Sequence, residues 1–186
     1  MKVINLHRDE KNLIQLAVKQ NRHAQHQLYT TFSPKMLGVC RQYIKDVQQA
    51  EDVMITAFMK VFTNLKAFEH KGSFEGWIRR IMVNECISFI RVQKQVKFIE
   101  DETFFEERWD SLEDHYSVEE IQLLIDQLPD GCRMVFTLFA IEGFKHQEIA
   151  KMLEISEGTS KSQLAHARKM LQKQLSKLKN KENGTE

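Results

Sequence analysis

Proline and glycine are scarce in this chain, and their scarcity limits the folds open to it more than any other feature. Only 2 prolines and 7 glycines occur in 186 residues. A sandwich or barrel needs many tight turns, which these two residues usually help to build. The hydrophobic fraction of 42% provides enough apolar side chains for packed cores. The sequence therefore predicts a globular, all-α protein with one domain or two small ones.

Apolar residues recur at helical spacing in two blocks. In the first block, helices are expected up to a break before Pro34, again beyond that proline, over residues 49–66, and after Ser73, which suits an N-cap. In the second block, a helix stops at Pro129, and the next runs over 132–141 and ends at Gly143. A short helix over 146–153, a tight turn and a long helix to about 179, capped by Ser156, have the layout of a helix-turn-helix.

An acidic stretch separates the two blocks. Residues 100–120 contain ten acids against Arg108 alone, a net charge of −9, which leaves +10 for the rest of a chain whose total is +1. Two basic bodies joined by an acidic strap favour a polyanion partner such as nucleic acid. The alternative is a solvated charge run that serves solubility, and composition alone leaves both interpretations open.

The last helix predicts a surface for duplex DNA. Projected at about 100° per residue, Thr159, Ser162, His166 and Lys169 share the stripe opposite the leucines. Polar side chains near the helix start, here Ser162, Gln163 and His166, suit base edges, and Lys161 and Lys169 suit phosphates. An ordinary solvated helix face is the alternative. Arg168 projects nearer the apolar stripe, where it either reaches a phosphate or lies along the core.

Two further surfaces are expected in the first block. One combines the stripe of Arg80, Asn84, Arg91 and Lys94 with a preceding loop that carries Phe68, His70, Lys71 and Ser73. Cationic groups interleaved with aromatic rings suit single-stranded DNA. The other is the outer face of the 49–66 helix, with Asp52, Ile55, Thr56 and Met59. This mixed face indicates protein docking, and a core layer covered by N-terminal helices is the alternative.

Nothing in the sequence indicates catalysis. A glycine-rich phosphate loop, a HExxH motif and a GxSxG motif are all missing, so no enzyme and no cofactor are predicted. Cys40, Cys86 and Cys132 lie in apolar patterns and are interpreted as core thiols, and no metal site is expected. Without a signal peptide or an apolar run long enough for a membrane span, the expected location is cytoplasmic, with no stable membrane insertion.

In both blocks, the residues resemble the bacterial sigma-70 family of transcription initiation factors, specifically its small extracytoplasmic-function (ECF) group. In the first block the motifs are Ala50-Glu51-Asp52-Val53, Phe58-Met59-Lys60-Val61-Phe62 and Gly72-Ser73-Phe74-Glu75-Gly76-Trp77. In the second they are Glu142-Gly143-Phe144, Gln147-Glu148-Ile149-Ala150 and Gly158-Thr159-Ser160-Lys161-Ser162 with Ala167-Arg168. One departure is Glu154, which stands where the family usually has a turn glycine.

The resemblance implies a sigma region 2 over 1–98, an acidic linker over 99–117, a region 4 helix-turn-helix over 118–180 and a disordered tail over 181–186. It implies that Asp52, Ile55, Thr56 and Met59 bind core RNA polymerase. Residues Phe68, His70, Lys71, Ser73, Arg80, Asn84, Arg91 and Lys94 fall on the surface for the minus-ten element. Residues Thr159, Lys161, Ser162, Gln163, His166, Arg168 and Lys169 fall on the helix that reads the minus-thirty-five element.

The partners implied are core RNA polymerase, promoter DNA and an anti-sigma protein. A free-standing helix-turn-helix regulator, whose N-terminal body senses a ligand or dimerises, is the alternative. Such a regulator footprints duplex DNA unaided, whereas a small sigma factor needs polymerase.

Overall fold

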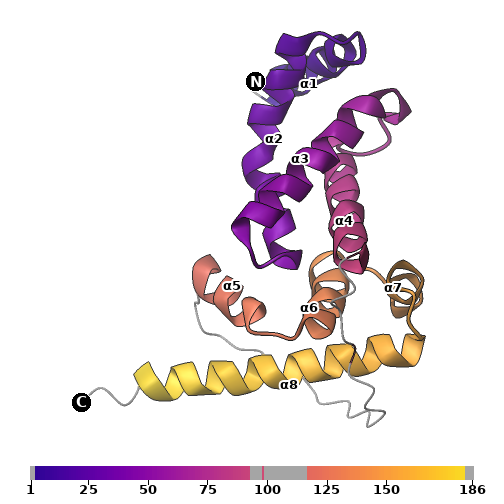
Figure 1. Cartoon of the computed structure of the whole chain (residues 1–186). Helices are drawn as coiled ribbons and strands as arrows, with labels where there is room; N and C mark the ends of the chain where they lie inside the picture. The colour runs from indigo at the N-terminus through magenta and orange to yellow at the C-terminus, as the bar shows by residue number, and fades with distance from the viewer. Residues whose placement is uncertain (1–2, 93–97, 99–116, 183–186) are drawn as a thin grey trace. The chain divides into compact units, whose positions relative to one another are not determined.

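The computed structural model describes residues 3–92, 98 and 117–182. Within these ranges every regular element is helical, which confirms the all-α prediction (Figure 1). The chain divides into two compact units, residues 1–89 and 90–186, which are described one at a time. The expected acidic linker over 99–117, apart from Ser117, and the end of the expected tail lie outside the described residues, as does Lys94.

The first unit is built from four α-helices and one short 3-10 helix. They are α1 (Val3–Val18), α2 (Arg22–Tyr43), α3 (Val47–Thr63), η1 (Leu65–Ala67) and α4 (Phe74–Val92). Side chains cap three of the helices: Asn21 accepts from the amide of Ala24 at 3.0 Å, and Asp46 from that of Gln49 at 2.8 Å. Ser73 accepts from the amide of Gly76 at 3.1 Å, as its predicted role as N-cap requires.

Helix α2 corrects one sequence prediction, because it runs through Pro34 without a break. Proline lacks the amide proton of the helical hydrogen bond, and inside a helix it costs about 3 kcal/mol. Buried side chains lie on both sides of it, with Leu28 and Phe32 before and Met36 and Cys40 after. Both halves thus share one buried stripe, and burying large apolar side chains at about 1.5–3 kcal/mol each outweighs the proline.

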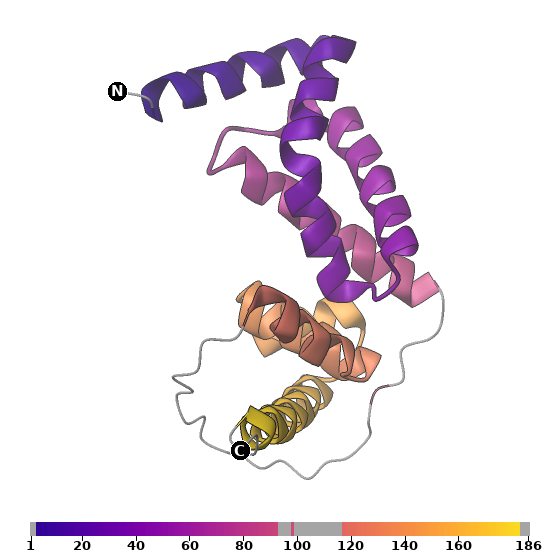
Figure 2. The same cartoon turned by 90° about the vertical axis from the view of Figure 1, so that its left-hand side faces the viewer.

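The core of the first unit lies between α2, α3 and α4, whereas α1 packs on α2 through Ile14 and Ala17 (Figures 1 and 2). Phe58 and Val61 of α3 and Ile78 and Met82 of α4 are all buried there. Two ion pairs tie the helices at the surface: Lys35 to Glu75 at 3.0 Å, and Lys60 to Glu85. The thiols of Cys40 and Cys86 are buried in this core, as predicted.

The second unit contains α5 (Val118–Asp126), α6 (Asp130–Phe136), a π-helical turn η2 (Thr137–Ile141), α7 (His146–Leu153) and α8 (Glu157–Glu182). A capping box between Ser117 and Glu120 starts α5. One buried cluster forms the core of this unit. It contains Leu124, Leu128, Cys132 of α6, and Ala167 and Leu171 of α8, so α8 packs along this core.

Helices α7 and α8 form the predicted helix-turn-helix (Figure 1). Glu154 closes α7 in the left-handed conformation, at φ 56° and ψ 44°. Ser156 then caps α8, since its Oγ accepts from the amide of Thr159 at 2.9 Å. Ile149 and Leu153 are buried, so the apolar face of α7 packs on the rest of the unit. In the described part of the chain, no helix is both long enough and apolar enough to cross a bilayer.

Candidate functional site

The outer face of α3 is exposed, as a docking surface requires. Ile55 is 50% and Met59 66% exposed, and Asp52 and Thr56 beside them are exposed as well. The alternative of a covered core layer is therefore wrong within this structure, because the buried stripe of α3 lies on its other side, at Val53, Ala57 and Val61. Exposed apolar side chains gathered on one face are typical of protein interfaces.

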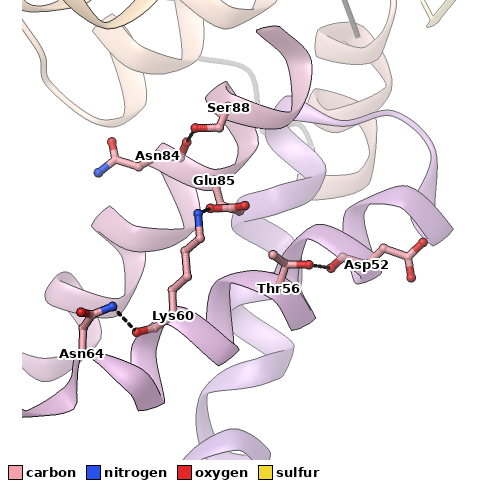
Figure 3. Close-up of polar contacts among 7 residues, drawn as sticks. All are labelled: Asp52, Thr56, Lys60, Asn64, Asn84, Glu85 and Ser88. Carbon is pink, nitrogen blue, oxygen red and sulfur yellow. Dashed lines mark hydrogen bonds and ion pairs between the residues drawn. The ribbon is translucent and has the colours of Figure 1, made fainter. Parts of the chain in front are cut away.

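Beside this face, polar contacts connect α3 to α4 and also form within α3 (Figure 3). Lys60 of α3 reaches across to Glu85 of α4, and the two side chains form an ion pair. Within α3, the hydroxyl of Thr56 donates to the carbonyl of Asp52 at 2.9 Å, so Thr56 is turned along its own helix. The Asp52 carboxylate remains at the surface. Sequence reasoning missed the link between Lys60 and Glu85, since no local spacing connects residues on two helices.

The loop between η1 and α4 is anchored by an aromatic cluster. Phe68 is only 8% exposed, and its ring lies 5.1 Å from Phe74, 5.5 Å from Trp77 and 4.7 Å from His70, centroid to centroid. The expectation that Phe68 is presented to an unpaired base is not met, because these neighbours enclose the ring. His70, in the left-handed region at φ 58°, and Lys71 are exposed.

The α4 surface keeps most of its predicted cationic and polar groups. Arg80, Asn84 and Arg91 are exposed, and Ser73 is exposed at the start of the helix. Asn84 lies one turn before Ser88, whose hydroxyl donates to the Asn84 carbonyl at 2.9 Å (Figure 3). Ile87 is buried and Trp77 is half-buried, so the exposed stripe consists of arginine and amide groups with the edge of one indole.

Two α8 residues that were predicted to contact bases are buried in the structure. Gln163 is fully buried, and its Oε1 accepts from the thiol of Cys132 at 3.2 Å. Ser162 is 5% exposed, and its hydroxyl donates to the carbonyl of Thr159 at 3.0 Å, which folds it back along the helix. The prediction that these two side chains reach base edges is wrong for this structure. Gln163 precedes Ala167 by one turn, and that spacing already marks it as core-facing.

The remaining residues of the predicted α8 surface stay accessible. Lys169 is exposed, and Thr159, Lys161, His166 and Arg168 are half-buried. The Nζ of Lys161 forms an ion pair with Glu157 at 2.8 Å, and this hydrogen bond lowers the pKa of the Glu157 carboxyl. His166 Nε2 is buried and has no hydrogen-bond partner among the described residues, so the ring reaches the surface through its other atoms. The face thus offers donors and positive charge, the groups that bind phosphate.

A small polar network that the sequence did not reveal connects α7 to α8. Ser160 is fully buried, and its Oγ lies 2.9 Å from Nδ1 of His146 in α7. The imidazole of His146 stacks on Phe139, with the ring centroids 4.6 Å apart. Burial lowers the pKa of His146, and the charges of Lys161 and Arg168 lower it further. No cluster of three or more metal-ligating side chains occurs within residues 3–92 and 117–182.

Comparison with known proteins matches each unit to a region of one protein family. Residues 28–96 match the model of sigma-70 region 2, and residues 118–171 match that of sigma-70 region 4. RNA polymerase sigma-H factor of Pseudomonas aeruginosa is 28% identical over 184 residues, which cover 91% of this chain and 95% of that protein. The ECF RNA polymerase sigma factor SigW of Bacillus subtilis is 27% identical, over 89% of this chain and 96% of SigW.

A solved structure of sigma factor RpoE from Bartonella quintana, in complex with the anti-sigma factor NepR, aligns with a TM-score of 0.49. Its identity is 23%, over 81% of this chain and 96% of that one. The two region models lie in the order that the family has, and each falls on the helices that carry the corresponding sequence motifs. This chain belongs to the sigma-70 family of transcription initiation factors, within its ECF group.

Proposed function

We propose that this chain binds core RNA polymerase through α3 and directs it to promoters through α4 and α8. The observation that carries the proposal is the match to both sigma-70 regions on one chain, in order. A free-standing regulator needs a helix-turn-helix but has no use for region 2, so this observation favours the sigma factor over the regulator. The work of initiation is thus divided between two helical units, one for each region.

The exposed face of α3 is proposed as the polymerase contact. Ile55 and Met59 supply apolar area, and Asp52 at its edge supplies a charge that selects partner and orientation. Thr56 lies between them, with its hydroxyl engaged within the helix. An anti-sigma protein, which the family implies, is proposed to compete for this same face, because covering it would block polymerase.

The minus-ten element is proposed to meet the exposed part of α4 and the loop before it. Arg80, Asn84 and Arg91 can contact the backbone and bases of an opened strand, with His70, Lys71 and Ser73 at the loop. Lys94, outside the described residues, continues the same stripe in sequence. Phe68 has a supporting role here, since its buried ring holds the loop that carries His70.

The minus-thirty-five element is proposed to meet α8. His166 is the candidate for base contact, and Lys161, Arg168 and Lys169 are candidates for phosphate contact, with Thr159 near the helix start. Ser162 and Gln163 are left out because their side chains are buried and bonded. This assignment requires no catalytic group and no cofactor. Since bacterial polymerase and promoter DNA are cytoplasmic, the same location is proposed for this chain.

Run-off transcription with core polymerase tests the proposal. The wild-type chain is expected to co-purify with core polymerase and to give promoter-dependent transcripts. The double variant Asp52→Lys, Met59→Glu is expected to weaken polymerase binding by about tenfold or more, because it inverts the charge and polarity of the α3 face. Its melting temperature should stay near that of the wild type, since both residues are exposed.

The matched control carries the same kinds of change on α1, as Asp9→Lys and Leu16→Glu, where Leu16 is 45% exposed. This control should bind polymerase like the wild type. Equal binding by the two double variants would refute the docking face. A footprint on duplex DNA without polymerase, together with no transcription in its presence, would refute the sigma-factor function itself in favour of the regulator.

A further inference from the structure

The guanidinium of Arg168 lies over the ring of Phe139. Its Cζ is 5.7 Å from the ring centroid, close enough for a cation–π attraction. Arg168 belongs to α8, whereas Phe139 belongs to the π-helical turn η2, so this contact joins two separate elements of the second unit. An arginine side chain has many rotamers in solution, and a ring beneath its head group restricts them.

The Phe139 ring is itself held in place. On η2, the amide of Glu142 donates to the carbonyl of Thr137 at 3.0 Å, which is the wide hydrogen bond of a π turn. His146 stacks on Phe139 with an interplanar angle of 22°, and it is tied to the buried Ser160 of α8. Rings from η2 and α7 therefore form a stacked pair that is anchored at Ser160, with Arg168 over the Phe139 ring.

The charges around this stacked pair suit an arginine over the Phe139 ring. Lys161 and Arg168 are the cations near His146, and Glu157 is the acid near it. Burial and the two cations lower the pKa of His146, so the imidazole is neutral near pH 7 and does not repel the guanidinium. A ring attracts a guanidinium through its π electrons and restricts its rotamers without adding a charge of its own.

We propose that Phe139 is a positioning residue for promoter binding: its ring, backed by His146, holds the Arg168 guanidinium ready for a DNA phosphate beside the minus-thirty-five element. The inference rests on the proposed function, since it takes Arg168 as a DNA contact. It goes further by giving a role to Phe139, a residue of the helix before the helix-turn-helix. Pre-orienting a long side chain improves binding because less conformational entropy is lost when the contact forms.

A double-mutant cycle in the reconstituted holoenzyme tests the proposal, with the wild-type chain, Phe139→Leu, Arg168→Gln and the combination. Binding of a promoter fragment is measured at several salt concentrations. Each single variant is expected to weaken binding by roughly two- to tenfold. The combination should be no weaker than Arg168→Gln alone, because the ring has nothing left to position. The slope of log affinity against log salt should fall by about 0.9 in Arg168→Gln, the value of one phosphate contact.

Three further variants separate positioning from a structural role. Phe139→Tyr keeps the ring and should restore wild-type affinity, and Phe139→Met replaces Phe139→Leu if the latter does not fold. Phe136→Leu, which loses a ring packed on the nearby core, should lower the melting temperature without changing the salt slope. A Phe139→Leu loss that persists in full on the Arg168→Gln background would overturn the proposal, as would unchanged affinity in Phe139→Leu.

The readouts also keep the two hypotheses apart. If the wild-type holoenzyme does not bind the promoter fragment, the proposed function is refuted before any variant is compared. A competent wild type whose affinity is unaffected by Arg168→Gln refutes the positioning role alone.

Discussion

Glu154 occupies a backbone conformation that suits glycine better than any side chain. Its φ of 56° lies in the left-handed region, where the Cβ crowds the backbone at a cost of about 1–2 kcal/mol. The residue closes α7, and the amide of Ile155 bonds to the carbonyl of Ala150 at 3.0 Å in the same turn. The positive φ follows from the turn and not from the residue.

Replacing Glu154 by glycine is expected to stabilise the second unit by about 1 kcal/mol, the strain relieved less the entropy that glycine adds to the unfolded chain. Urea denaturation of the full-length variant measures the change. Lys151→Gly is the control, because Lys151 is exposed in α7 itself, and glycine there should cost about 1 kcal/mol. A loss of stability in Glu154→Gly would show that the turn is not strained.

A histidine with a lowered pKa lies in the contact between α7 and α8. His146 is half-buried against Phe139 and Ser160, with Lys161, Arg168 and Glu157 as its charged neighbours. Burial, more than those two cations, holds its pKa below the ordinary 6.5, while Glu157 acts in the opposite direction. In the unfolded chain this histidine takes up a proton at a higher pH than in the folded one, so acid favours unfolding.

Stability of the second unit is therefore expected to be full above pH 6.5 and to fall as the pH drops below that value, through the lowered pKa of folded His146. His146→Gln, with no titrating ring, should flatten this part of the profile. Denaturation followed from pH 7.5 to 5 provides the measurement, and His23→Gln, at an exposed position of α2, serves as the control. Identical profiles for wild type and His146→Gln would contradict the expectation.

Local sequence patterns predicted most of the helices, but they did not predict the continuous helix through Pro34 or the burial of Gln163. The helix expected over 49–66 is α3 followed by η1, and the caps at Ser73 and Ser156 lie where the sequence placed them. Capping depends on neighbouring residues, so a sequence can reveal it. Pro34 was misjudged because the buried stripe of α2 outweighs a local penalty. Gln163 was misjudged because its polar side chain was given more weight than its core-facing spacing to Ala167. The group that bonds to it in the core, the Cys132 thiol, is 31 residues away.

At the scale of the whole molecule, each unit has its own core. Leu28, 2% exposed, is buried in the first unit, and Leu128, 0% exposed, in the second. The two leucines form a matched pair, since both are buried and one lies in each unit. Truncating a buried leucine to alanine typically costs 2–5 kcal/mol, about as much as a small domain can lose before it unfolds.

Leu28→Ala is accordingly expected to destabilise the first unit alone, and Leu128→Ala the second alone, each by about 2–5 kcal/mol. Amide hydrogen exchange resolved by peptide reads both units in one full-length sample: α2 and α4 report the first unit, and α6 and α8 the second. Faster exchange in both units on either substitution would mean that the chain unfolds as one body.

The buried thiols have a consequence for how signals can reach this chain. Burial raises the pKa of the Cys132 thiol to about 11. A hydrogen bond between Cys86 and Cys40, together with burial, raises the pKa of Cys86. Peroxides and disulfides react with the thiolate, which is scarce for Cys132 near neutral pH because its pKa is raised. All three cysteines of the chain are shielded in this way from solvent. Thiol oxidation is therefore slow in the folded protein, and a redox signal carried by thiol chemistry must act through a partner.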